Sequence, residues 1–377
     1  TLTAVAGNGY WIDTTSNACT ITLPASASNG DEIMFADYAR NWAVNNIIVD
    51  SNGLNYQGKA DTFAVRYATT GTALHIVYSG ATNGWIPITD DDVETVFLTQ
   101  GIFGFGTTGS YTGVTNLVST SGVVASDVAA VGTARIDLSA CEYGSDKGIF
   151  AFGSDGSVSD ITNLVSTAGV VASDGSGVGT ARMDAAGCSY GTDKGIFAFG
   201  NTGSYIDESN LVSSIGVLGA DVTGVGTDRA YLSGCEYGTG TAIMAYGYHG
   251  SDVNTINLIS NIGVVAADST GAGTAERMRD ACSYGTNYDK GIFGYGNGPV
   301  ATTNLVSNVG VVSADVSGVG TARQDVAATQ YGSDKGIFGF GSGFVSMTNL
   351  VSNTGVVGSD VTGVGTGRAS LAACSFS

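Results

Sequence analysis

The stretch Asp334-Lys335-Gly336-Ile337-Phe338-Gly339-Phe340-Gly341 decides the fold, because versions of it recur through most of the chain. Its Gly-Ile or Ala-Ile core begins six times, at Gly101, Gly148, Gly195, Ala242, Gly291 and Gly336. The intervals between these positions are 47, 47, 47, 49 and 45 residues. A near-constant period of this length indicates structural units that bury their apolar faces against one another. Everything after about residue 95 is therefore predicted to be six copies of one unit.

The composition of the 377-residue chain favours an all-β fold. Hydrophobic residues make up 43%, enough for a sizeable core, and charged residues make up only 12%. Glycine accounts for 58 residues and proline for 3, which suits short strands joined by tight turns. Strand-favouring Val, Ile, Thr, Phe and Tyr are abundant, whereas helix-favouring Glu and Lys are scarce.

Each unit is predicted to contain four short antiparallel strands, which in the second copy cover 136–143, 147–153, 162–166 and 169–172. The connections after the first and third strands have the Gly, Ser and Asp residues of tight turns. Four such strands repeated every 40–50 residues or so are typical of a β-propeller blade. The strand that contains Gly-Ile-Phe is interpreted as an inner strand of its blade.

The ends of the repeat region predict how a ring would close. The first unit begins at its second strand, 96–106, and the last unit is followed by an unpartnered first strand, 369–376. We expect the C-terminal strand to complete the first blade, because a closed ring leaves no edge strand exposed. The expectation is a six-bladed β-propeller at 96–377, closed by strand 369–376.

Residues 1–89 contain no copy of the repeat and are predicted to form a small β-sandwich-type domain. Trp11, Trp42 and Trp85 are its expected core anchors, with exposed platforms for sugar stacking as the alternative. An acidic linker is expected at 90–95, because Asp90-Asp91-Asp92-Val93-Glu94 is the one dense run of charge. Its four carboxylates would keep the two domains apart by repulsion, and a cation site is the alternative.

Residues 4–88 resemble a module of bacteriophage tail fibres and other virion proteins. The resemblance rests on Ala4 to Thr15, Ile21-Thr22-Leu23-Pro24-Ala25-Ser26 and the closing Gly84-Trp85-Ile86-Pro87-Ile88. The repeats are similar to kelch repeats, with a Phe-Gly-Phe-Gly strand and an Arg that opens the first strand. The double glycine and outer-strand tryptophan of kelch repeats are absent, so the chain is kelch-like and kelch functions are not carried over. The resemblance implies an extracellular virion protein.

The loops between the second and third strands differ most among the copies, and they share one face of the predicted propeller. Variable loops on a rigid scaffold commonly carry recognition, and aromatic side chains are good anchors for sugars or protein surfaces. Drift in unconstrained loops is the alternative. The candidate ligand-binding residues in these loops are Tyr111, Tyr205, Tyr248, His249, Phe344 and Met347.

Two charged residues recur in the units. A ring of arginines is expected on the same face, either as an anion site or as ties between blades; it comprises Arg135, Arg182, Arg229, Arg323 and Arg368. The register slips at Glu276-Arg277-Met278-Arg279. The aspartates are expected to form Asx turns, with calcium as the alternative; they are Asp127, Asp174, Asp221, Asp268, Asp315 and Asp360.

The cysteines are predicted to be free thiols that pack as small hydrophobic groups. Five of the six occupy one position of the repeat: Cys141, Cys188, Cys235, Cys282 and Cys374. Equivalent positions of neighbouring units are expected to lie too far apart for the roughly 7 Å that a disulfide permits between Cα atoms.

The sequence argues against several function classes. A formal net charge of −19 without a basic cluster would repel nucleic acid, and no run of 18 apolar residues predicts a membrane span. The chain begins at Thr1 with no visible leader, which suggests a processed or truncated chain. The two histidines, His75 and His249, lie in different predicted domains, and no nucleophile motif or metal-binding cluster appears.

The expected function is therefore a non-enzymatic virion component, a tail fibre or appendage. No cofactor is expected, with calcium as the alternative noted above. The N-terminal domain would bind other virion proteins or sister subunits, as in a homotrimer, and the propeller would bind a host-surface glycan or protein. A secreted glycan-binding lectin is the second hypothesis. A glycosidase with two carboxylates is the third, although nothing in the sequence singles out a pair.

Overall fold

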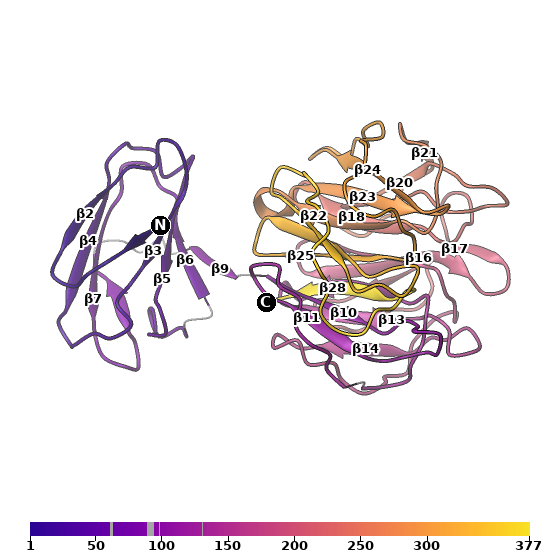
Figure 1. Cartoon of the computed structure of the whole chain (residues 1–377), viewed down its shortest axis with the longest axis horizontal. Helices are drawn as coiled ribbons and strands as arrows, with labels where there is room; N and C mark the ends of the chain where they lie inside the picture. The colour runs from indigo at the N-terminus through magenta and orange to yellow at the C-terminus, as the bar shows by residue number, and fades with distance from the viewer. Residues whose placement is uncertain (61–62, 89–93, 98, 130) are drawn as a thin grey trace. The chain divides into compact units, whose positions relative to one another are not determined.

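The computed structural model describes residues 1–60, 63–88, 94–97, 99–129 and 131–377. Within these ranges the protein is all-β, as predicted, with no α-helix and one short 3-10 turn, η1 (Thr286–Tyr288). The chain divides into two compact units, Thr1–Leu98 and Thr99–Ser377 (Figure 1).

The first unit contains two sheets that share one apolar core. One sheet has the order β1 (Leu2–Thr3), β3 (Cys19–Thr22), β5 (Ile47–Asp50), β6 (Phe63–Tyr67) and β9 (Glu94–Phe97). The other has the order β2 (Gly9–Ile12), β4 (Glu32–Asp37), β7 (Ala73–Tyr78) and β8 (Trp85–Pro87). Alternate side chains of β4 point into the core, where Ile33 and Phe35 are buried while Glu32 and Met34 are exposed.

The second unit contains six sheets, one for each repeat. The first is β28 (Ala372–Phe376), β10 (Gln100–Gly104) and β11 (Thr115–Val118); the second is β12 (Ser139–Tyr143), β13 (Lys147–Ala151) and β14 (Thr162–Val165). The third is β15 (Ala186–Tyr190), β16 (Lys194–Asn201) and β17 (Tyr205–Val212); the fourth is β18 (Ser233–Tyr237), β19 (Thr241–Ala245), β20 (Thr255–Ile259) and β21 (Ser269–Thr270). The fifth is β22 (Asp280–Tyr284), β23 (Lys290–Gly296) and β24 (Val300–Val306); the sixth is β25 (Ala327–Tyr331), β26 (Lys335–Gly339) and β27 (Thr348–Val351).

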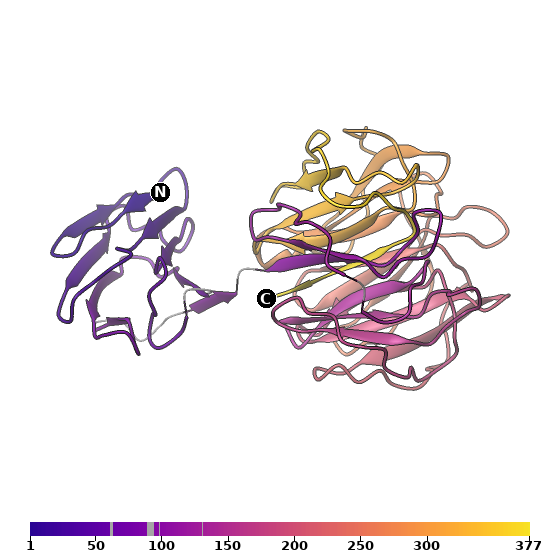
Figure 2. The ribbon, with the colours of Figure 1, turned by 60° about the horizontal axis from the view of Figure 1, so that its bottom comes forward.

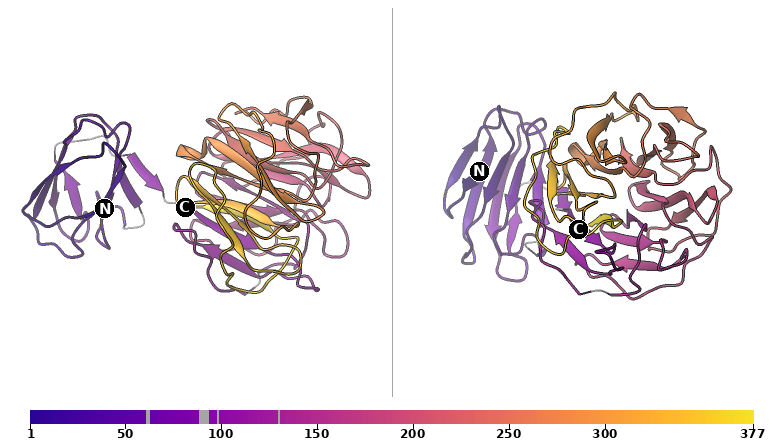
Figure 3. Two further views of the ribbon diagram at one scale, coloured as in Figure 1. Left: turned by 45° about the horizontal axis from the view of Figure 1, so that its top comes forward. Right: turned by 45° about the vertical axis from the view of Figure 1, so that its right-hand side comes forward.

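The C-terminal strand pairs with the first strand of the repeat region. Strand β28 is antiparallel to β10, with Cys374 opposite Ile102 (Figure 2). The first strands of the six sheets also contact one another in order, β12 to β15, β18, β22, β25 and β28, and β28 contacts β12 again. The sheets consequently surround a common centre, which the right-hand view of Figure 3 shows.

Three details of the predicted organisation are wrong. Glu94 and Thr95 lie in β9, which pairs with β6, so this part of the predicted linker belongs to the first unit; positions 89–93 lie outside the described residues. The expected first propeller strand, 96–106, is likewise split between β9 and β10. The Gly-Ile-Phe strand is the second strand from the centre in each sheet of the second unit, and the strand nearest the centre is the predicted first strand.

The predicted fourth strand is reduced in most sheets to isolated bridges, such as Val165 to Val171 and Thr162 to Gly175. A side chain interrupts the ladder: Nδ2 of Asn163 donates to the carbonyl oxygen of Ala172 at 3.1 Å and to Oδ1 of Asp174 at 2.9 Å. The asparagine therefore holds the outer segment at positions where strand pairing would otherwise continue.

The repeated Gly-Ile glycine has a packing cause. A Cβ atom on Gly148 would collide with Sγ of Cys374 in the neighbouring sheet. The same relation joins Gly195 to Cys141, Gly291 to Cys235 and Gly336 to Cys282. All six cysteines are free and the five repeated ones are buried, as predicted. Four of these thiols fill the space that a glycine of the neighbouring sheet leaves open, whereas alanine, Ala242, stands at that position after Cys188.

Candidate functional site

The repeated arginines are not a surface for ligands. Arg135, Arg182, Arg229 and Arg368 are 0% exposed and Arg323 is 1% exposed, so the predicted anion site is wrong. Each guanidinium instead lies over an aromatic ring of the preceding sheet, as Arg368 does over Phe340 at 4.2 Å. Burial lowers the pKa of Arg368 to about 10, which leaves the guanidinium charged at neutral pH. The alternative interpretation, a tie between neighbouring repeats, describes these residues.

The register slip leaves this arrangement intact. Glu276 takes the arginine's place in the sequence, and Arg279 reaches the aromatic site from three residues further on. The Arg279 guanidinium lies 4.5 Å from the centre of the Tyr246 ring, and its Nη1 donates to Oδ1 of Asn304 at 2.6 Å. This asparagine is equivalent to Asn257, which accepts from Arg229 in the preceding sheet at 2.7 Å.

The repeated aspartates tie each sheet to the segment that enters it. Oδ2 of Asp174 accepts from Oγ1 of Thr133 at 2.7 Å, and the Thr133 amide donates to the same carboxylate. Asp127 accepts from Thr366 in the same way and so joins the two ends of the repeat region. The predicted Asx turns are thus replaced by hydrogen bonds between segments.

A ring of six residues surrounds the centre of the second unit where the first strands begin. Its members lie two residues after the arginine position, all with φ between 53° and 58°: Asp137, Asp184, Tyr231, Met278, Asp325 and Ser370. We call this the mouth ring. Its amides and carbonyls bond around the centre, with Asp184 N to Asp137 O at 2.9 Å and Asp137 N to Ser370 O at 3.1 Å. Five such bonds link neighbouring members of the ring and hold the positive φ values.

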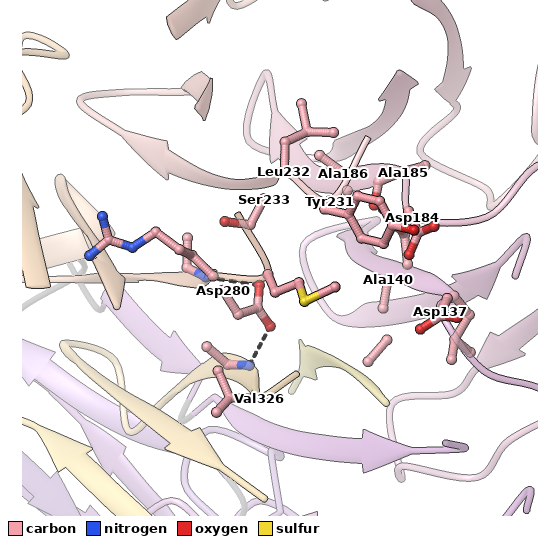
Figure 4. Close-up of a pocket in the computed structure, with 18 of the residues that line it drawn as sticks. Asp137, Ala140, Asp184, Ala185, Ala186, Tyr231, Leu232, Ser233, Asp280 and Val326 are labelled. Atoms are coloured by element: carbon pink, nitrogen blue, oxygen red, sulfur yellow. Dashed lines mark hydrogen bonds between the residues drawn. The ribbon is translucent and has the colours of Figure 1, made fainter. Parts of the chain in front are cut away.

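The mouth ring lines a cavity of about 120 Å³, the mouth pocket. Figure 4 shows Asp137, Asp184 and Tyr231 on one side of it and Asp280 on the other. Burial, together with the charge of Asp325, raises the pKa of Asp137 to about 6. Burial and the charges of Asp137 and Asp325 also raise the pKa of Asp184. The pocket is thus an acidic site whose carboxylates repel one another.

Three of the predicted loop residues come together beside the mouth pocket. Tyr205, at the start of β17, lies 6.0 Å from Tyr248 in an edge-to-face arrangement and 6.2 Å from His249, both ring centre to ring centre. Arg277, from the segment before β22, lies 4.4 Å above the Tyr248 ring. Tyr205, Tyr248, His249 and Arg277 are the loop cluster, and they come from three successive repeats.

Polar contacts fix the loop cluster. Nδ1 of His249 lies 2.7 Å from the carbonyl oxygen of Asp228, which only accepts, so Nδ1 carries a proton. Nε of Arg277 lies 3.5 Å from Oδ1 of Asp252. Tyr205 and Tyr248 are half-buried and His249 is exposed. The cluster thus offers aromatic edges and polar groups on a surface that is already ordered.

Tyr231 connects the loop cluster with the mouth pocket. Burial raises the pKa of Tyr231 to about 12, with added contributions from the charges of Asp184 and Asp137 and from Tyr205, while Arg277 lowers it. The pKa of Tyr231 is therefore affected both by the carboxylates of the pocket and by side chains of the cluster. We treat the mouth pocket and the loop cluster as one candidate site.

The other predicted loop residues do not join this site. Tyr111 is 44% exposed in the loop of the first sheet. Phe344 and Met347 line a separate open pocket of about 450 Å³ in the sixth sheet. The loop positions are therefore not equivalent, and only the third and fourth loops contribute aromatic residues to the shared site.

A second group of acidic residues, the second level, lies further along the six first strands that surround the centre. A cavity of about 40 Å³ is lined by all six first strands, including Glu142, Glu236 and Gln330. Burial raises the pKa of Glu142 to about 7 and that of Glu236 to about 8, and Glu142 adds to the latter. Oγ of Ser375 and Nε2 of Gln330 donate to Oε2 of Glu142.

The first unit has its own exposed aromatic surface. Trp42 and Trp85 are buried as predicted, but Trp11 is 78% exposed, so its role as a core anchor is wrong. Alternation places Trp11 outward because its neighbour Ile12 is buried. With Met34 and His75 it lines a groove of about 450 Å³ over Gly9, Ala36 and Ala73.

Sequence reasoning missed the mouth ring, although a signal for it exists. Positions 137, 184, 231, 278 and 325 are spaced by 47 residues, as the arginines before them suggest. They vary as Asp, Asp, Tyr, Met and Asp, whereas the repeat around them is nearly constant. Variation at one position of an otherwise constant repeat can therefore indicate a functional site, just as variation among the loops can.

The described ranges contain no group of three or more His, Cys, Asp or Glu side chains placed to hold a metal ion. They also contain no helix with the length and apolar character needed to cross a membrane.

Comparison with known proteins does not identify a family for this chain. The chain matches no protein-family model, and a search of curated proteins found no significantly similar sequence.

Proposed function

We propose that this chain is a non-enzymatic structural protein of a bacteriophage virion, a tail fibre or appendage that attaches the particle to its host. Residues 99–377 would form a six-bladed, kelch-like β-propeller, and residues 1–98 a sandwich-type domain that binds other virion proteins or sister subunits. The resemblance of residues 4–88 to tail-fibre modules supports the extracellular virion context. Six sheets whose first strands contact one another in a cycle support the propeller.

The observation that carries attachment is the convergence of the loop cluster beside the mouth pocket. Tyr205 and Tyr248 come from the loops of different repeats, yet their rings lie 6.0 Å apart. Half-buried tyrosines supply flat contact area with little side-chain entropy to lose on binding. A sugar or a flat protein surface is the ligand that such a cluster suits.

The test is adsorption of the parent particles to their host cells in competition with purified full-length chain. We expect the unmodified chain to block adsorption and Y205A/Y248A to lose at least tenfold in blocking potency. Y111A, which changes an exposed tyrosine on a distant loop, is the matched control and should block normally. Equal blocking by Y205A/Y248A and the unmodified chain, with equal thermal unfolding, would refute attachment through this cluster.

A secreted glycan-binding lectin would use the same cluster. Immunogold labelling of the parent particles separates the two, since a virion component labels intact particles and a lectin does not. Release of reducing sugar from host polysaccharide by the purified chain would contradict the non-enzymatic assignment.

A further inference from the structure

We propose that the mouth pocket binds the protonated amine of an amino sugar, whose pyranose ring rests against Tyr231 and the loop cluster. The inference rests on the proposed attachment function and names the ligand class for that site.

The first argument is the charge of the pocket wall. Three of the six mouth-ring residues are aspartates, and Asp280 adds a fourth carboxylate to the lining. The one cationic side chain in that lining is Arg279, whose guanidinium is engaged by Asn304 and the Tyr246 ring. A cationic group entering the pocket would therefore meet a wall in which carboxylates outnumber cationic side chains four to one.

The second argument is an oxygen without a donor. Oδ2 of Asp184 is shielded from solvent and has no hydrogen-bond partner in the described part of the chain. A buried acceptor without a donor is costly, and more so when the group is charged. Asp280 differs, because its two oxygens accept from the amides of Ala281 and Ala328. Asp184 is therefore the carboxylate that a ligand N–H group would satisfy.

The third argument is size. The cavity, at about 120 Å³, is small for an oligosaccharide. One amine-bearing edge of a sugar fits this space, whereas a disaccharide must extend over the rim. Tyr231 lines the pocket and is close enough to Tyr205 for that residue to affect its pKa, so a ligand anchored by its amine could continue onto the aromatic cluster.

The arrangement suits an ammonium group better than a metal ion. A metal needs several ligands at one centre, and the described residues provide no such group of three. An ammonium has three donors that can reach separate carboxylates. Burial and mutual repulsion raise the pKa values of Asp137 and Asp184, and a bound cation would relieve that repulsion.

The test is calorimetric titration of the full chain with two tetrasaccharides of the same skeleton. The β-1,4-linked glucosamine tetramer carries amines, and the N-acetylglucosamine tetramer carries neutral amides. We expect the amine form to bind at least tenfold more tightly. D137N/D184N should abolish that preference, whereas D155N, which removes an exposed loop carboxylate, should keep it.

The control variant separates a site from general attraction. The chain carries a net charge of −19, so the loss of two charges would barely change non-specific binding of a cation. Equal affinity for the two tetramers, or a preference that survives D137N/D184N, overturns the proposal. Competition by calcium chloride alone at micromolar concentration, or tighter binding of tetralysine that ignores Y205A/Y248A, overturns it in favour of a metal or a protein ligand.

Failure of this inference is distinguishable from failure of the attachment function. If adsorption depends on Tyr205 and Tyr248 but the amine gives no advantage, attachment stands and the ligand class is wrong. If Y205A/Y248A leaves adsorption unchanged, the attachment function fails whatever the tetramers show.

Discussion

Nη1 of Arg368 donates to Oδ1 of Asn116 at 2.7 Å, although 252 residues separate the two in the sequence. The same guanidinium donates through Nε to the carbonyl oxygen of Phe105 at 2.8 Å. One buried side chain from the last repeat therefore satisfies two acceptors in the first sheet. This contact, together with the pairing of β28 and β10, joins the ends of the repeat region.

Replacement of Arg368 by alanine should destabilise the second unit by about 3–5 kcal/mol, because it leaves buried acceptors and an aromatic face without a partner. Urea unfolding followed by far-UV circular dichroism measures the change in the free energy of unfolding. K335A removes an exposed lysine paired with Asp334 and should cost less than about 1 kcal/mol. Similar losses in both variants would show that the buried arginine does not hold the junction.

The hydrogen bonds from Thr366 to the Asp127 carboxylate predict that the stability of the fold falls in acid. Burial alone would raise the pKa of Asp127, but hydrogen bonds from Thr366 and Asn116 outweigh it and lower the pKa below 3.8. A carboxylate with a lowered folded pKa stabilises the fold above its unfolded pKa, and this contribution disappears as the pH falls through the folded pKa. D127N should be less stable than the unmodified chain at pH 7, with a smaller difference near pH 2. A stability difference between the two proteins that stays constant across that pH range, measured by urea midpoints, would contradict a stabilising role for the Asp127 carboxylate.

The glutamates at the second level predict the opposite dependence. Their pKa values are raised, so their protonation favours the folded state. The stabilisation is complete below the unfolded pKa near 4.5 and is lost as the pH rises through about 7 for Glu142 and about 8 for Glu236. E142Q/E236Q should therefore stabilise the chain at pH 8.5 by about 1–3 kcal/mol for each group and flatten its stability between pH 5 and 8.5. An unchanged pH profile of the melting temperature would refute this assignment.

The contact between Gly148 and Cys374 predicts a rescue. G148A should destabilise by about 1–3 kcal/mol, because the new methyl group collides with the thiol of the neighbouring sheet. C374A removes that sulfur, so the double variant G148A/C374A should recover part of the loss. Additive losses in the two single variants and the double variant would show that the collision is not the cause.

The repeat, the strands and the C-terminal pairing could be predicted because each follows from a period that is visible in one dimension. The roles of particular side chains could not. A repeated arginine is compatible with a solvent-facing anion site and with a buried tie, and the burial of Arg368 over the Phe340 ring decides between them. Tyr10-Trp11-Ile12 likewise does not reveal which residue faces inward, and the structure turns Trp11 out. The mouth pocket could not be predicted from the sequence, because its residues come from separate repeats and meet only when the sheets surround a centre.

The position of Arg279 has a consequence for exchanging repeats between sites in the chain. Restoring the common arginine with E276R alone would bring two guanidinium groups to one buried aromatic site, since Arg279 already occupies it over Tyr246. A substitution toward the consensus should therefore weaken the protein here. Pairing it with R279L, the residue type at the equivalent Leu138, Leu232 and Leu371, should restore a single occupant. Modules of this chain can be interchanged only when both positions move together.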